Sequence, residues 1–165
     1  DTESTSRKDE WEVQRDANKV LGDNAFRGSN FVEAIQHYTN ALDLDPTNHI
    51  ILSNRSAANL KVSNKSKALK DATACIEANP KFAKGYSRLA AAQQSLGRWK
   101  DALESYKNAL QLDSANSVAK NGLEECQAVI TKMEEEERKI LQEHQSAESD
   151  KADAKTEKQQ KDKPE

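Results

Sequence analysis

Aromatic residues make up only 5% of the 165-residue chain, and apolar residues of all kinds only 35%. These fractions are low for a compact globular domain, but they suit a single layer of stacked helices with polar ends. The sequence has no apolar run near the roughly 18 residues that a membrane-spanning helix needs. No leader of basic, apolar and small residues opens it either. We therefore expect a cytoplasmic protein with no membrane partner.

The sequence also lacks a basic excess and the usual signs of a reactive centre. Its formal net charge is −3, which gives no general attraction to nucleic acid. The two cysteines, Cys75 and Cys126, are isolated, and His37, His49 and His144 have no second ligand at metal spacing. There is no glycine-rich phosphate loop and no nucleophile elbow. We expect no nucleic-acid partner, no metal, no cofactor and no catalytic residue.

What the sequence does contain is a pattern that recurs every 34 residues. Alanine stands at Ala34, Ala68 and Ala102, and proline stands at Pro46 and Pro80 with Ser114 in phase. Small columns are expected where two helices approach closely, and large columns where repeats pack on each other. The matching columns are Gly22, Ser56 and Ala90; Ile35, Leu69 and Leu103; Tyr38, Ala72 and Tyr106; Ala41, Cys75 and Ala109; and Leu44, Ala78 and Leu112.

This period and these columns resemble the tetratricopeptide repeat, a helix-turn-helix unit that must stack on its neighbours to bury its apolar face. The repeats would span residues 15–48, 49–82 and 83–116. The resemblance implies an all-α fold, a right-handed α-α superhelix of three helix pairs. Two columns depart from the family: Ser114 replaces a proline, and Asn59 and Gln93 stand where tyrosine is frequent.

Turn residues predict the helix boundaries. Breaks are expected at Gly28-Ser29-Asn30, Ser63-Asn64 and Gly97-Arg98 within repeats, and around Pro46 and Pro80 between them. Residues 117–142 show helical apolar spacing and are expected to cap the last repeat. Residues 1–14 form a polar extension, helical from about residue 9, in which Trp11 and Val13 either prolong the first helix or pack on it. Residues 143–165 are expected to be a charged, mostly disordered tail.

The function follows from the first helix of each repeat, because these helices line the concave side of such a stack. They carry Lys19 and Asp23, then Asn54, then Lys84 and Arg88. Residues four apart share a helix face, so these side chains are expected to point into one groove. Cationic groups at both ends with an amide between them predict a receptor for an extended peptide that carries two carboxylates.

The segments Ser53–Ala58 and Lys84–Arg88 are similar to co-chaperones whose repeats form a carboxylate clamp, most closely the N-terminal module of the Hsp-organising (stress-inducible) adaptors. The resemblance implies binding to the C-terminal Glu-Glu-Val-Asp of a 70-kDa or 90-kDa heat-shock chaperone, or both. By this carry-over Lys19 and Asn54 hold the terminal carboxylate. Lys84 meets the last aspartate side chain, with Arg88 supporting the peptide. The implied groove wall comprises Phe26, Ala57, Leu60, Lys61 and Gln94.

Asp23 departs from this clamp, because the family pattern has asparagine at its position. An ionised aspartate only accepts hydrogen bonds and repels a ligand carboxylate. It is also placed to pair with Lys19, four residues earlier. We therefore expect Asp23→Asn to tighten binding. Two alternatives stay open: a general scaffold for a non-chaperone peptide, and a docking arm of a larger enzyme.

Overall fold

The computed structural model describes residues 9–161, and it shows helices and turns but no strand in that range. The predicted all-α class is confirmed. The chain divides into two compact units, one ending at Cys126 and the other beginning at Gln127. The helices are α1 (Glu10–Arg27), α2 (Phe31–Leu44), α3 (His49–Lys61), α4 (Lys65–Ala78), α5 (Ala83–Ser95), α6 (Trp99–Leu112) and α7 (Ser117–Lys161).

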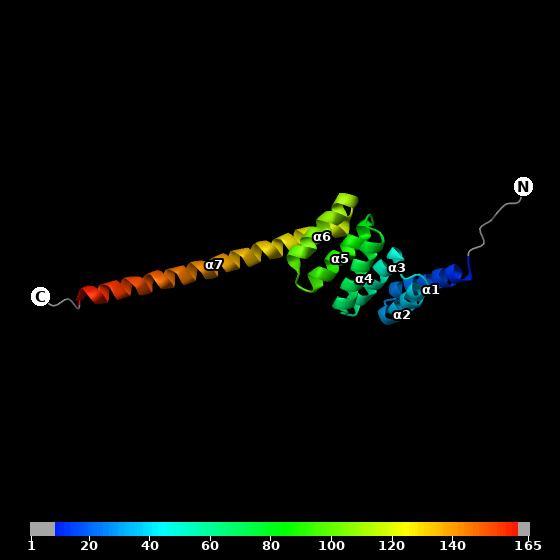
Figure 1. Cartoon of the computed structure of the whole chain (residues 1–165), viewed down its shortest axis with the longest axis horizontal. Coiled ribbons are helices and arrows are strands. Elements are labelled where there is room, and N and C mark those ends of the chain that lie inside the picture. Colours follow the sequence, from blue (N-terminus) through cyan, green and yellow to red (C-terminus); the bar gives the residue numbers. More distant parts are fainter. Residues whose placement is uncertain (1–8, 162–165) are drawn as a thin grey trace, which may run out of the picture. The chain divides into compact units, whose positions relative to one another are not determined.

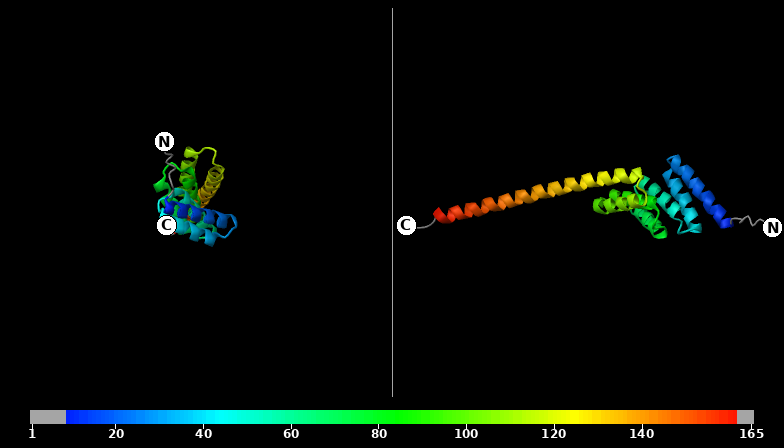
Figure 2. Two further views of the ribbon diagram at one scale, coloured as in Figure 1. Left: turned by 90° about the vertical axis from the view of Figure 1, so that its right-hand side faces the viewer. Right: turned by 90° about the horizontal axis from the view of Figure 1, so that it is seen from above.

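The first unit is a stack of three helix pairs. From α1 to α6 each helix packs on the next, in the order of the chain (Figure 1 and Figure 2). In addition α3 contacts both α1 and α5. The first helices of the three pairs are therefore neighbours and present one common face, as the repeat pattern predicts.

Four of the recurring columns are buried in all three repeats and form the core, whereas Ala78 and Leu112 of the Leu44 column are exposed. Ala34, Ala68 and Ala102 are all fully buried, each inside the second helix of its pair. Gly22 is small because the ring of Tyr38 lies against it: a Cβ atom added to Gly22 would lie 2.6 Å from Cε1 of Tyr38. The small column therefore marks the close approach of the two helices, as predicted.

The turn inside each pair contains one residue with a left-handed backbone. Ser29 has φ 63°, Ser63 has φ 62° and Gly97 has φ 74°. These positions are again 34 residues apart. Only the third repeat uses glycine, the residue that adopts this conformation without steric cost.

The start of α1 decides between two alternatives that the sequence left open, and the end of α7 differs from the prediction. Helix α1 includes Trp11 and Val13, so these residues prolong the first helix, and residues 1–8 of the polar extension lie outside the described residues. Helix α7 does not end near residue 142 but continues to Lys161. The segment predicted to be mostly disordered is rich in Ala, Glu, Lys and Gln, which favour helix, and it has no glycine, and no proline before Pro164. Within the range described, no helix is both long enough and apolar enough to cross a membrane.

Candidate functional site

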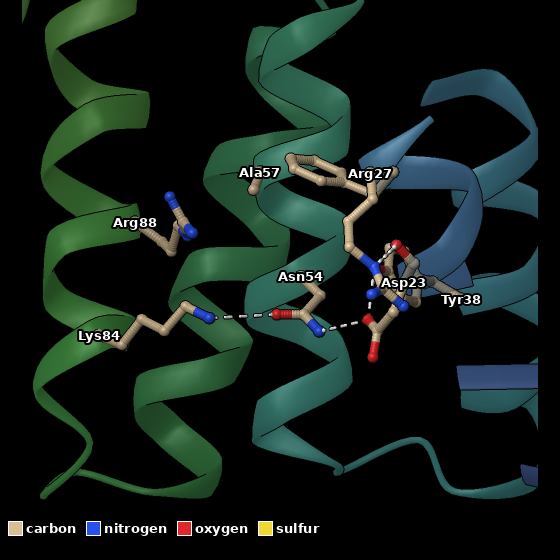
Figure 3. A pocket seen from close by; sticks show the side chains of 8 residues that line it. Asp23, Arg27, Tyr38, Asn54, Ala57, Lys84 and Arg88 are labelled. Atoms are coloured by element: carbon tan, nitrogen blue, oxygen red, sulfur yellow. Dashed lines mark hydrogen bonds between the residues drawn. The ribbon is translucent and has the colours of Figure 1, made fainter. Parts of the chain in front are cut away.

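The predicted clamp residues meet on the face shared by α1, α3 and α5. A cavity of about 340 Å³ opens there (Figure 3). Its lining brings together cationic, amide, carboxylate and aromatic groups from three repeats, although Lys84 is 30 residues from Asn54 in the chain. The lining residues are Asp23, Phe26, Arg27, Tyr38, Asn54, Ala57, Lys84 and Arg88.

Asp23 is the centre of a hydrogen-bond network on one side of this cavity. Nζ of Lys19 donates to Oδ2 of Asp23 at 2.7 Å, so the pairing expected from their spacing is present. Oη of Tyr38 donates to Oδ1 at 2.7 Å, and Nδ2 of Asn54 donates to the same oxygen at 3.0 Å. The two groups predicted to hold a peptide carboxylate, Lys19 and Asn54, are thus both bonded to a carboxylate of the chain itself.

This network keeps Asp23 ionised. Burial by itself would raise the pKa of Asp23, but the hydrogen bonds from Lys19, Tyr38 and Asn54 together with the charge of Lys19 outweigh it and hold the pKa below its ordinary value. The pKa of Tyr38 is strongly raised, first by burial and then by its hydrogen bond to Asp23. The phenol therefore stays protonated and remains a donor.

Lys84 and Arg88 lie on α5, at the other side of the cavity. Nζ of Lys84 makes one long hydrogen bond of 3.4 Å to Oδ1 of Asn54, and Nε of Arg88 is buried without a hydrogen-bond partner. Partial desolvation, and then the charge of Arg88, lower the pKa of Lys84; burial lowers the pKa of Arg88. Neither side chain forms an ion pair with the side chains described for residues 9–149 and 151. The charge of Asp23 acts on Lys84 without an ion pair between them.

Arg27 and Tyr38 also line the cavity, and the sequence-based prediction missed both as site residues. Arg27 has a signal in the sequence, because it is four residues after Asp23 and eight after Lys19 on the same helix face. Its Nε donates to the backbone oxygen of Asp23 at 3.4 Å. Tyr38 stood in a core column of the repeat, and nothing in that column indicated that its hydroxyl reaches the groove.

The predicted groove wall is represented in part. Phe26 and Ala57 line the cavity. Leu60 and Lys61 follow on α3, and Gln94 lies on α5, where its Oε1 accepts a hydrogen bond of 2.9 Å from Oη of Tyr106. None of these three belongs to the lining of this cavity, so a role for them stays a prediction.

Arg55, in the segment that resembles the clamp family, and Cys75 both have contacts that stabilise the fold and do not belong to the cavity. Arg55, next to Asn54, makes two hydrogen bonds of 2.9 and 2.7 Å to the carboxylate of Asp71 on α4, away from the cavity. The Cys75 thiol is fully buried, and burial raises its pKa to about 11, as its core column predicts. No three metal-ligating side chains lie together within the described residues.

Comparisons with known proteins point to one family. The tetratricopeptide repeat family model matches residues 83–116. Heat shock protein STI1 of Saccharomyces cerevisiae is 41% identical over 111 residues, which cover 67% of this chain and 19% of that protein. The chain thus matches only 19% of the length of this curated relative.

Solved structures agree in fold. The crystal structure of the Sgt2 TPR domain from Aspergillus fumigatus has 32% identity and a TM-score of 0.71, over 73% of this chain and 82% of that one. The first TPR of Spaghetti (RPAP3), bound to the HSP90 peptide SRMEEVD, has 28% identity and a TM-score of 0.70, over 72% of this chain and 94% of that one. The predicted superhelix of helix pairs is therefore confirmed.

Proposed function

The chain belongs to the tetratricopeptide repeat family, and from that premise we propose that its groove binds the acidic C-terminal peptide of a 70-kDa or 90-kDa heat-shock chaperone. The proposed role is that of a co-chaperone or adaptor module. The Spaghetti domain has an HSP90 peptide that ends in Glu-Glu-Val-Asp as its ligand, and its fold covers 72% of this chain.

The observation that carries this proposal is the pair of cations on α5, Lys84 and Arg88, which form no ion pair with another side chain that the structure describes. Arg88 is half-buried and its Nε has no hydrogen-bond partner, while Lys84 is exposed and makes one long hydrogen bond. An acidic side chain placed between them would satisfy both. Charge-assisted hydrogen bonds of this kind contribute roughly 1.5 to 3 kcal/mol each when desolvated.

The other groove residues then have distinct roles. We propose that Lys19 and Asn54 hold the terminal carboxylate of the peptide, near Asp23, which accepts hydrogen bonds from both of them. Phe26 and Ala57 supply apolar surface in the same cavity for the preceding valine. The proposed activity is binding alone, without catalysis by this chain, in the cytoplasm.

Calorimetric titration with acetyl-Met-Glu-Glu-Val-Asp tests the proposal. We expect an affinity of the order of micromolar, and a loss of at least about tenfold in Lys84→Ala and in Arg88→Ala. Lys100→Ala is the matched control, because Lys100 is exposed on α6 and does not line the cavity. Equal affinity in the wild type and both groove variants would refute the proposal and favour a general scaffold.

A further inference from the structure

The groove is divided into two halves that differ in charge. The filled half consists of Lys19, Asp23, Arg27, Tyr38 and Asn54, and it already contains an anion, the Asp23 carboxylate. The open half consists of Lys84 and Arg88, which form no ion pair with the side chains described for residues 9–149 and 151. A peptide that ends in aspartate brings two carboxylates, one on the side chain and one at the terminus. Only the carboxylate that enters the filled half comes to lie beside the anion Asp23.

The filled half offers an acceptor where a carboxylate-binding site needs donors. Oδ1 of Asp23 receives two hydrogen bonds, from Tyr38 and from Asn54, which use both of its lone pairs. Oδ2 receives one, from Lys19, and has one lone pair left. A ligand group that donates a hydrogen bond can use this lone pair. A second carboxylate has no proton to donate to it and meets the negative charge of Asp23, although Lys19 and Asn54 keep N–H groups that Asp23 does not occupy.

The open half has the opposite preference. Nζ of Lys84 has a single long hydrogen bond, and Nε of Arg88 has none, so both retain donors for an acidic side chain. Both belong to α5, four residues apart on one helix face, so one carboxylate can reach both (Figure 3). Affinity at this end depends on the ligand's side-chain charge and not on the form of its terminus.

We propose that this groove selects an acidic peptide through a side-chain carboxylate at Lys84 and Arg88, and that it accepts a terminal carboxamide beside Asp23 almost as well as a free terminal carboxylate. This inference rests on the proposed function and deepens it. The ligand class is wider than free C-termini, because a carboxamide presents the N–H donor that the free lone pair of Asp23 Oδ2 accepts.

Three peptides and two proteins test this. The peptides are acetyl-Met-Glu-Glu-Val-Asp as the free acid, the same peptide as the carboxamide, and the free acid with asparagine in place of the last aspartate. Each is titrated by calorimetry into the full chain and into Asp23→Asn. In the wild type, amidation should weaken binding by no more than about threefold, and the asparagine peptide should bind at least about tenfold more weakly.

In Asp23→Asn the relative affinities of the free acid and the carboxamide should change. The side-chain amide that this substitution introduces supplies a donor, so the free acid should bind more tightly than to the wild type, and amidation should now cost at least about tenfold. Far-UV circular dichroism of Asp23→Asn verifies its fold. The wild-type comparison of the three peptides stands without the variant.

The outcomes separate this inference from the proposed function. A wild type that loses tenfold or more on amidation, while it binds the free acid, overturns the inference and leaves the proposed function intact. Absence of binding by all three peptides to both proteins overturns the two together. Both are supported if the wild type binds the free acid and the carboxamide with similar affinity and the asparagine peptide much more weakly.

Discussion

The phenol of Tyr38 and the carboxylate of Asp23 are joined by a hydrogen bond of 2.7 Å, between residues 15 positions apart on α1 and α2. Tyr38 is 2% exposed, and its ring packs against Gly22. The core of the first repeat thus extends, through one side chain, into the groove. The position of Asp23 is set by that core and not only by its neighbours on α1.

Tyr38→Phe should therefore lower the free energy of unfolding by about 1 to 2 kcal/mol, because Asp23 loses a donor while the ring still fills its place. Urea denaturation of the purified chain measures this. Tyr106 provides a comparison, since its hydroxyl donates to the neutral amide oxygen of Gln94. Tyr106→Phe should cost less than Tyr38→Phe, and the reverse order would contradict the role given to the ionised Asp23.

The pKa of Asp23 predicts how stability depends on pH. Because this pKa lies below its ordinary value in the folded chain, the stabilisation by ionised Asp23 is present above the unfolded-state pKa and is lost as pH falls through the folded-state pKa. Asp23→Asn should be less stable than the wild type at pH 6, and the difference should shrink as the pH falls below about 4, the ordinary pKa of an aspartate. Paired urea titrations at pH 6 and below about pH 4 measure it, with the exposed Asp101→Asn as control. A difference that does not vary with pH would show that the charge of Asp23 contributes nothing.

We expect Arg88 to lower the free energy of unfolding of the protein without peptide. Its Nε is buried without a partner, and burial lowers its pKa. Arg88→Met keeps much of the length of the side chain and removes the charge, so it should leave the free energy of unfolding unchanged or raise it by about 1 kcal/mol, while peptide affinity falls. Thermal denaturation without peptide, with the exposed Arg98→Met as control, distinguishes this from a residue that supports the fold. A clear loss of stability in Arg88→Met would contradict it.

Arg55, in contrast to Arg88, should stabilise the folded chain. Its two hydrogen bonds neutralise Asp71, whose side chain is only 6% exposed. Arg55→Ala leaves that charge buried and should cost about 3 kcal/mol or more. The double variant Arg55→Ala, Asp71→Ala should recover part of the loss, as chemical denaturation of the single and double variants would show. If the double variant is no more stable than Arg55→Ala, the buried charge is not the cause.

The left-handed turns offer a stabilising substitution. Ser63 has φ 62°, a conformation that costs an L-residue about 1 kcal/mol and glycine almost nothing. Ser63→Gly should therefore raise the free energy of unfolding by about 0.5 to 1 kcal/mol. Gly97→Ser, the reverse change at the equivalent turn, should lower it by a similar amount, since no atom lies within 4 Å of the added Cβ and only the backbone opposes it. Effects of the same sign at both turns would contradict this explanation.

The sequence by itself determined the repeat, its register and the face on which the clamp residues lie. A period of 34 residues assigns every position to a helix face, and this is why Ala34, Ala68 and Ala102 were predicted to be buried and Lys84 to share a groove with Asn54. The pairing of Lys19 with Asp23 was also predictable, because both residues belong to one helix.

Only the tertiary structure decided what Asp23 does in the groove. Tyr38 and Asn54 come from two other helices, and no local pattern specifies which hydrogen-bond partner each one takes once the helices pack. The same holds for Arg27, whose contribution depends on the cavity that the three repeats enclose. Local periodicity assigns residues to faces, whereas the distances between helices decide which of those residues bond to one another.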